Sequence, residues 1–141
     1  MRRLALLATA GLALAMAGGC SSSPEDTRRE AAEGALSWAA GARMTAEAWS
    51  ARRVTSAFAR AGLEAAQRGL EQERTRLGAA PRALADARGA VDADAIATLS
   101  VLVARMQQAV ERGDGAGLAA LETELAAAAR GLQPSTRGAG T

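Results

Sequence analysis

The 141-residue sequence predicts an all-α protein, a small antiparallel bundle of three to four alanine-rich helices. Alanine accounts for 39 residues and is the strongest helix former, whereas the β-branched residues that favour strands are few. Apolar residues recur at steps of three and four, which is the spacing of helices that bury one face. Breaks containing glycine or proline separate these stretches, so we expect several helices and no sheet.

The bundle is expected to occupy residues 24–132 and to begin at a well-marked helix start. Ser23 can cap the helix, Pro24 suits its first turn, and acids follow at the positive end of the helix dipole. Helical spacing then puts both tryptophans on one face, within the series Ala35, Trp38, Ala42, Thr45 and Trp49. We expect the tryptophans to anchor the core, and a ligand pocket between them is the alternative.

The segment 52–56 leaves two arrangements open. It contains no glycine or proline, so residues 25–77 can form one helix, but it loses the apolar stripe, and Thr55 or Ser56 can cap a new helix. One helix of that length would reach about 80 Å and leave the tryptophans uncovered. We therefore favour a turn near residues 54–56, followed by a second helix that buries Ala59, Leu63, Ala66, Leu70 and Leu77.

Two clearer breaks delimit the rest of the bundle. Gly78 suits the end of one helix and Pro81 the first turn of the next. Gly113 suits the end of that third helix, and Asp114 the cap of a fourth. Residues 133–141 are expected to form a disordered tail. The third helix is expected to bury Leu84, Val91, Ala95, Leu99, Leu102, Met106 and Ala109, and the fourth Leu118, Leu121, Leu125, Ala128 and Leu132.

Small residues recur every seven positions along the first two helices, at Gly34, Gly41, Ala48, Thr55, Gly62 and Gly69. A glycine inside a helix costs roughly 0.5–1 kcal/mol relative to alanine, so such a stripe needs a reason. One reason is that it lets a neighbouring helix approach closely. The alternative is chance, because the chain holds 15 glycines.

The N-terminus has the organisation of a bacterial export signal. Arg2 and Arg3 precede an apolar run over residues 4–17, which is too short to span a bilayer as a helix. The run ends in small residues directly before Cys20, the one cysteine of the chain. This arrangement resembles the lipobox of bacterial lipoproteins. The resemblance implies that residues 1–19 are removed, that the Cys20 thiol carries a diacylglycerol, and that residues 20–23 are a short linker.

The same resemblance implies a membrane-anchored protein outside the cytoplasm. A further acyl chain, such as palmitate, usually joins the new amino group, and two or more chains make a stable anchor. Ser21 provides no inner-membrane retention signal, so the implied location in a Gram-negative cell is the outer membrane, facing the periplasm. In a Gram-positive cell it is the outer leaflet of the plasma membrane. An ordinary secretory signal and an uncleaved anchor are the alternatives.

Composition argues against several functions. The chain has no histidine, the commonest metal ligand and general base, and one cysteine cannot build a zinc site. Once Arg2 and Arg3 are removed, 15 arginines balance 15 acids, so nucleic-acid binding is not expected. Neighbouring acids such as Asp92 and Asp94 face different ways on a helix. We expect no enzymatic activity, no metal and no cofactor.

Two functions follow as expectations. The favoured one is a lipid-anchored, non-enzymatic structural or interaction module whose partner is an envelope protein. Its candidate surface is the local basic excess of Arg43, Arg52, Arg53 and Arg60, since arginine binds carboxylate and phosphate groups well. A solvated helix face is the plainer interpretation of these arginines. The alternative function is a periplasmic ligand-binding or chaperone-like module that holds an apolar molecule among Trp38, Trp49 and Phe58.

Overall fold

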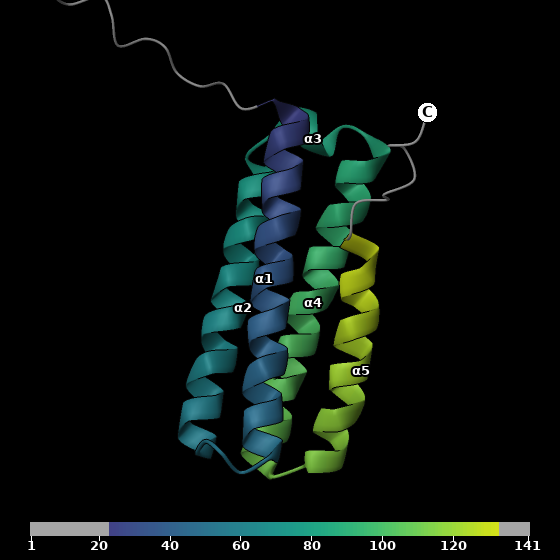
Figure 1. Cartoon of the computed structure of the whole chain (residues 1–141). Coiled ribbons are helices and arrows are strands. Elements are labelled where there is room, and N and C mark those ends of the chain that lie inside the picture. Colours follow the sequence, from purple (N-terminus) through teal and green to yellow (C-terminus); the bar gives the residue numbers. More distant parts are fainter. Residues whose placement is uncertain (1–22, 133–141) are drawn as a thin grey trace, which may run out of the picture.

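A computed structural model describes residues 23–132 as an all-α bundle of four long helices and one short helix, which confirms the predicted fold class (Figure 1). The predicted signal peptide, Cys20 and the tail at 133–141 lie outside the described residues. The helices are α1 (Pro24–Ser50), α2 (Ser56–Gly78), α3 (Pro81–Leu84), α4 (Ala87–Arg112) and α5 (Gly115–Leu132).

The long helices alternate in direction along the chain (Figure 1). The start of α1 and the short α3 lie at one end of the bundle, which we call the proximal end. The connections at residues 51–55 and 113–114 lie at the opposite, distal end. The favoured turn between the first two helices is therefore confirmed, and residues 25–77 form two helices rather than one.

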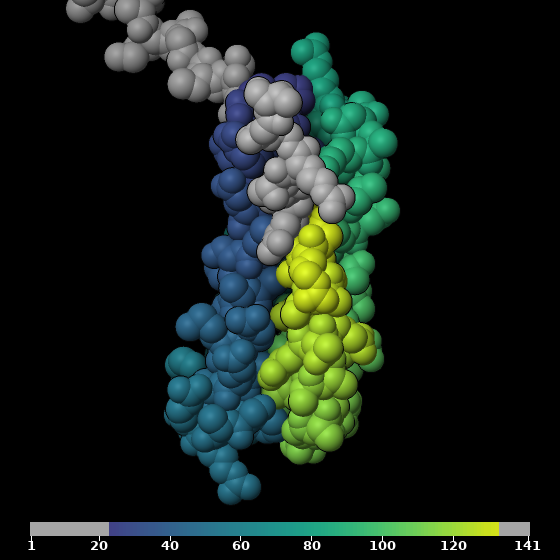
Figure 2. Space-filling model, turned by 45° about the vertical axis from the view of Figure 1, so that its right-hand side comes forward, coloured from purple at the N-terminus to yellow at the C-terminus, as the bar shows by residue number. Residues whose placement is uncertain are grey.

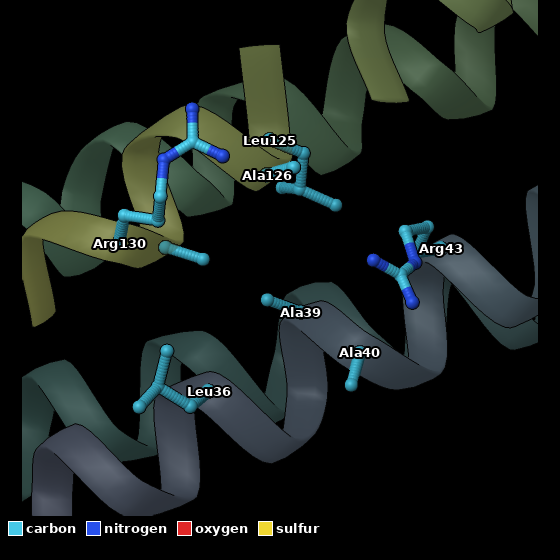
Figure 3. A pocket seen from close by; sticks show the side chains of 8 residues that line it. Leu36, Ala39, Ala40, Arg43, Leu125, Ala126 and Arg130 are labelled. Atoms are coloured by element: carbon cyan, nitrogen blue, oxygen red, sulfur yellow. The ribbon is translucent and has the colours of Figure 1, made fainter. Parts of the chain in front are cut away.

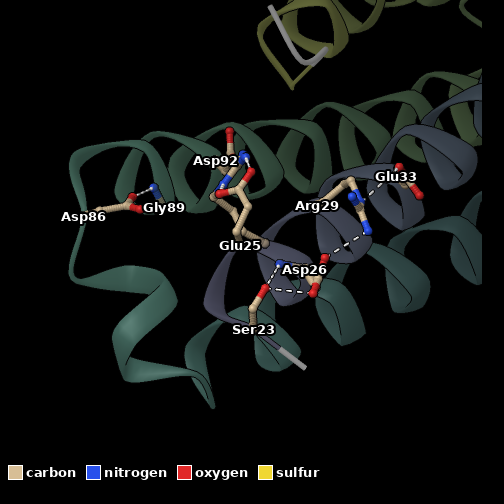
Figure 4. Close-up of polar contacts among 9 residues, drawn as sticks. Ser23, Glu25, Asp26, Arg29, Glu33, Asp86, Gly89 and Asp92 are labelled. Carbon is tan, nitrogen blue, oxygen red and sulfur yellow. Dashed lines mark hydrogen bonds and ion pairs between the residues drawn. The ribbon is translucent and has the colours of Figure 1, made fainter. Parts of the chain in front are cut away.

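Local capping explains why the helices begin where they do. The Ser23 hydroxyl accepts a hydrogen bond of 3.1 Å from the Asp26 backbone N–H, as Figure 4 shows. The Thr55 hydroxyl accepts one of 3.2 Å from the Phe58 backbone N–H and starts α2. Each cap satisfies a backbone donor that has no partner inside its helix.

The prediction of one helix from Pro81 to Arg112 is wrong, because Asp86 interrupts it. The Asp86 carboxylate accepts a hydrogen bond of 2.6 Å from the Gly89 backbone N–H, and this cap separates α3 from α4. Glycine is required at 89, since a Cβ there would overlap the backbone carbonyl of Ala83.

The break also corrects the predicted buried face of the third helix. Val91 is 58% exposed, whereas its neighbour Asp92 is 1% exposed and lies on the core side. The rest of the predicted stripe from Leu99 onward is buried, including Leu102, Met106 and Ala109. The buried face therefore differs from the predicted one only in the first turns of α4.

The core is asymmetric in side-chain size. Every buried residue of α1 is an alanine, at positions 31, 32, 35, 39, 42 and 46. The larger core residues come from the other helices, and Leu63, Leu70, Ile96, Leu99 and Met106 are fully buried. With only alanines among its buried residues, α1 contacts α2, α4 and α5, whereas α2 and α5 do not contact each other anywhere along their described lengths.

The predicted small-residue stripe mediates close packing of α1 on α2. A Cβ at Gly34 would lie 2.5 Å from the Glu73 carboxyl, and one at Gly62 would lie 3.0 Å from the Thr45 methyl. A Cβ at Gly69 would overlap the Trp38 ring. Gly41, by contrast, faces open space, so the stripe serves packing at three of its four glycines.

An ion pair joins α1 to α4 at the proximal end (Figure 4). The Arg28 guanidinium donates to Asp92 Oδ2 at 2.6 Å, across 64 positions of sequence, and Arg28 also contacts Glu25. Hydrogen bonds to Glu25 and Asp92 raise the pKa of Arg28 above its usual value. Because Asp92 is buried, loss of Arg28 would leave an uncompensated charge in the core, which is among the costlier defects in a protein.

The glycine stripe yields a stability test with an internal control. Gly69→Ala should lower the free energy of unfolding by about 1–3 kcal/mol, because the new methyl displaces the Trp38 ring. Gly41→Ala should raise it by about 0.5–1 kcal/mol, since nothing opposes the gain in helix propensity. Urea unfolding measures both. In a Trp38→Ala background the Gly69 change should become stabilising, and a cost that persists there would show that Trp38 is not the obstacle.

Candidate functional site at the distal end

The distal end carries a hollow of about 630 Å³ between the two helix connections. Residues from the end of α1, the start of α2 and the start of α5 form its wall. The lining mixes one aromatic ring, hydroxyl groups and both signs of charge: Trp49, Ser50, Arg52, Val54, Thr55, Ser56, Gly113, Gly115, Ala119 and Glu122. We call this set the distal hollow.

The two connections that border the distal hollow share one backbone arrangement. At the end of α4, Asp114 N–H donates to Ala109 C=O at 2.9 Å, and Gly113 adopts a left-handed conformation with φ 68°. At the end of α1, Arg53 N–H donates to Ala48 C=O at 2.8 Å. Both patterns are Schellman motifs, in which the left-handed residue is usually glycine.

Arg52 occupies the left-handed position at the end of α1, with φ 57°. It is the one residue other than glycine with positive φ in the described part of the chain. A left-handed conformation costs roughly 1–2 kcal/mol for residues with a Cβ. The backbone therefore favours glycine at position 52, and the arginine side chain is present despite that preference.

Trp49 fastens the connection from α1 to α2. Its indole Nε1–H donates a hydrogen bond of 3.0 Å to the Ser56 hydroxyl, which joins the last turn of α1 to the first turn of α2. The ring is half-buried and packs against the core while it lines the distal hollow. This contact joins the α1 and α2 sides of the hollow's wall.

Glu122 places a carboxylate where the fold does not compensate it. Its Oε1 atom is shielded from solvent and accepts no hydrogen bond from residues 23–132. Burial raises the pKa of Glu122, repulsion from Glu47 raises it further, and attraction to Arg43 opposes both. Arg43 is itself paired with Glu47 at 3.2 Å, so little of its charge is left for Glu122.

A second hollow, of about 360 Å³, lies between α1 and α5 and is nearer to the proximal end than the distal hollow. Figure 2 shows these two helices side by side, and Figure 3 shows Arg43 and Arg130 flanking the hollow. Between these arginines the lining side chains are apolar and mostly small, because alanines of α1 and α5 face each other across the hollow. They are Leu36, Ala39, Ala40, Leu125, Ala126 and Ala129.

The structure divides the predicted basic cluster. Arg52 and Arg53 lie together in the α1–α2 connection, and Arg60 is exposed in the first turns of α2. None of these three forms an ion pair with an acid among the described residues. Arg43 belongs instead to the α1–α5 seam.

The three aromatic residues do not gather around either of these two hollows. Trp38 is 37% exposed and lies against Gly69, so it is not the core anchor that we expected. Phe58 is 61% exposed near the start of α2. Of the three, Trp49 alone lines the distal hollow.

Sequence reasoning missed three acids that the fold places unusually, namely Glu73, Asp92 and Glu122. Asp92 stands seven residues before Leu99, so helical spacing could have assigned it to the buried face. Glu122 directly follows Leu121 at the edge of the α5 stripe, a position that carries no such signal, because its environment depends on how closely α5 approaches α1.

The chain shows no match to a family model, to a curated protein or to a solved structure. Within residues 23–132, no group of three or more acids, cysteines or histidines is placed to hold a metal ion. No helix in that range has the length and apolarity needed to cross a membrane.

The position of Glu122 makes stability depend on pH in a defined direction. Since its pKa is higher in the folded state than in the unfolded chain, the folded state binds the proton more tightly, and ionisation destabilises it. Glu122→Gln should therefore raise the free energy of unfolding at pH 7. The gain should shrink as the pH falls through the raised pKa toward the unfolded value of about 4.3. Chemical denaturation at a series of pH values measures this, and a constant difference would contradict it.

Proposed function

We propose that this chain is a lipid-anchored, non-enzymatic interaction module of the cell envelope, which binds an anionic partner at its distal end. The observation that carries the proposal is the position of one group of arginines that form no ion pair with a described residue. Arg52, Arg53 and Arg60 lie at or near the end of the bundle opposite Ser23, the residue through which the linker from Cys20 enters. Arg82 and Arg88 at the proximal end also form no ion pair with a described residue, but they lie near the acids Glu25 and Asp86, whereas the distal group has no acid between residues 51 and 60. A tether at one end and a group of arginines without neighbouring acids at the other suit a protein that reaches away from a membrane.

The geometry supports this division between anchor and contact. Helix α1 has 27 residues, so it carries the distal end about 40 Å from the proximal end. Arginine at an exposed turn presents a planar group that binds carboxylate or phosphate through two hydrogen bonds. An outer-membrane location facing the periplasm is part of the proposal for a Gram-negative cell, and it rests on the resemblance of the N-terminus to lipoprotein signals.

A second candidate is the binding of an apolar segment, and the exposed side chains near the α1–α2 seam favour it. Met44 is 66% exposed and Phe58 61% exposed. Met44 adjoins Thr45, which packs against Gly62, and Phe58 precedes Gly62 by one helical turn. Exposed apolar side chains in one region mark candidate protein contacts.

Charge reversal at the distal end tests the favoured proposal. In intact cells, chemical crosslinking of the tagged protein should give an adduct of defined mass. Arg52→Glu with Arg53→Glu should reduce its yield about tenfold or more, because each charge-assisted hydrogen bond contributes about 1.5–3 kcal/mol. The matched control is Arg82→Glu with Arg88→Glu, the same charge change at exposed positions of the proximal end, which should leave the yield unchanged.

Further arms of this experiment separate the proposals. Equal loss in both charge-reversed proteins would show that only net charge matters and would contradict distal binding. Loss only in Met44→Ala with Phe58→Ala would favour the apolar candidate. Cys20→Ala should remove the protein from the membrane fraction or block its processing, and unchanged processing and membrane association would refute the lipid anchor.

A further inference from the structure

We propose that the distal hollow binds a small zwitterion, a free amino acid or a short peptide, with the ligand carboxylate at Arg52 and the ligand ammonium at Glu122. Both side chains line this hollow, and no ion pair joins them. The inference concerns the same end of the bundle as the proposed function, but it depends neither on the lipid anchor nor on a protein partner.

The first supporting observation is the arginine in a glycine position. Gly113 and Arg52 end α4 and α1 in the same left-handed conformation, and both border the hollow. At Gly113 the residue matches what the backbone favours, whereas at Arg52 a guanidinium is kept at a cost in backbone energy. Residues held in such conformations cluster at functional sites, so Arg52 is a candidate ligand contact.

The second observation is the uncompensated carboxylate across the hollow. Glu122 Oε1 has no hydrogen-bond donor among the described residues, and the nearby Arg43 is engaged by Glu47. A half-buried carboxylate in this position destabilises the folded state, as its raised pKa indicates. A ligand ammonium would pair with this carboxylate through Oε2, the oxygen that is not shielded, and would offset the negative charge that Oε1 shares.

The two observations together select the class of ligand. An anion alone would meet the Glu122 carboxylate, and a cation alone would meet Arg52, so each would be opposed by one wall. A molecule that carries both charges satisfies both walls. The volume of about 630 Å³ is within the usual range for small-ligand sites, and Trp49 with Val54 offers apolar contact between the charged groups.

Binding can be tested on the purified full-length protein with three probes that differ in charge separation: alanine, alanyl-alanine and trialanine. Isothermal titration calorimetry should detect binding by at least one of them, and the Trp49 indole N–H resonance should shift in the NMR spectrum. The probe that binds is then blocked at either end: N-acetylation removes its ammonium, and C-terminal amidation removes its carboxylate. Each modification should weaken binding about tenfold or more, which corresponds to about 1.4 kcal/mol.

Two variants keep this test independent of folding. Arg52→Gly and Glu122→Gln should each be at least as stable as the parent protein, yet each should weaken binding about tenfold or more. Arg112→Gln is the matched control, since Arg112 is an exposed arginine at the same end of the bundle but does not line the hollow, and its affinity should stay within about twofold of the parent.

Three results would overturn the inference. They are no binding by any probe at millimolar concentration, equal binding of the blocked peptides, and unchanged affinity in both Arg52→Gly and Glu122→Gln. Because no partner or membrane is present, these results would leave the crosslinking test of the proposed function unaffected.

Discussion

The restriction of the buried face of α1 to alanine is the constraint that organises the bundle. Six alanines form that face, so the neighbouring helices must come close to exclude water. Helix α1 consequently touches three other long helices, including α4 across the middle of the bundle, while α2 and α5 are held apart. The leucines of α2, α4 and α5 fill the remaining space, and Gly62 and Gly69 let α2 approach α1 still further.

The alanine face of α1 buries little apolar area per residue, so polar contacts that join α1 to its neighbours at the ends of the bundle gain in importance. At the proximal end, Arg28 reaches Asp92 and ties α1 to α4. At the distal end, Trp49 donates to Ser56 and ties α1 to α2. The α1–α5 seam has no comparable contact among the described residues, and the two hollows discussed here both lie along it. The two polar contacts therefore lie on the sides of α1 that face α2 and α4. The two hollows lie on the side of α1 that faces α5.

Helix-forming composition, Ser23, Thr55 and the glycine and proline breaks were enough to predict a bundle of three to four helices and most of their limits, because each of these signals is local. The break at Asp86 was missed because its cap depends on Gly89 and on how Ala83 packs against it. Trp38 was assigned to the core because its spacing is right, but the alanines beside it fill that role at closer range. Glu122 and Arg52 line one hollow because the first turns of α5 lie beside the α1–α2 connection. The spacing of residues within one helix cannot predict such an arrangement.

The dependence on the alanine face is tested most directly by comparing two leucine substitutions on α1. Ala42 is fully buried among its neighbours, whereas Ala40 is exposed two positions earlier. Ala42→Leu should lower the free energy of urea unfolding by about 1–3 kcal/mol, since the helices would have to separate. Ala40→Leu should change it by less than about 0.5 kcal/mol. Equal effects of the two substitutions would contradict the account, because they would show that α1 can accept bulk on its inner face.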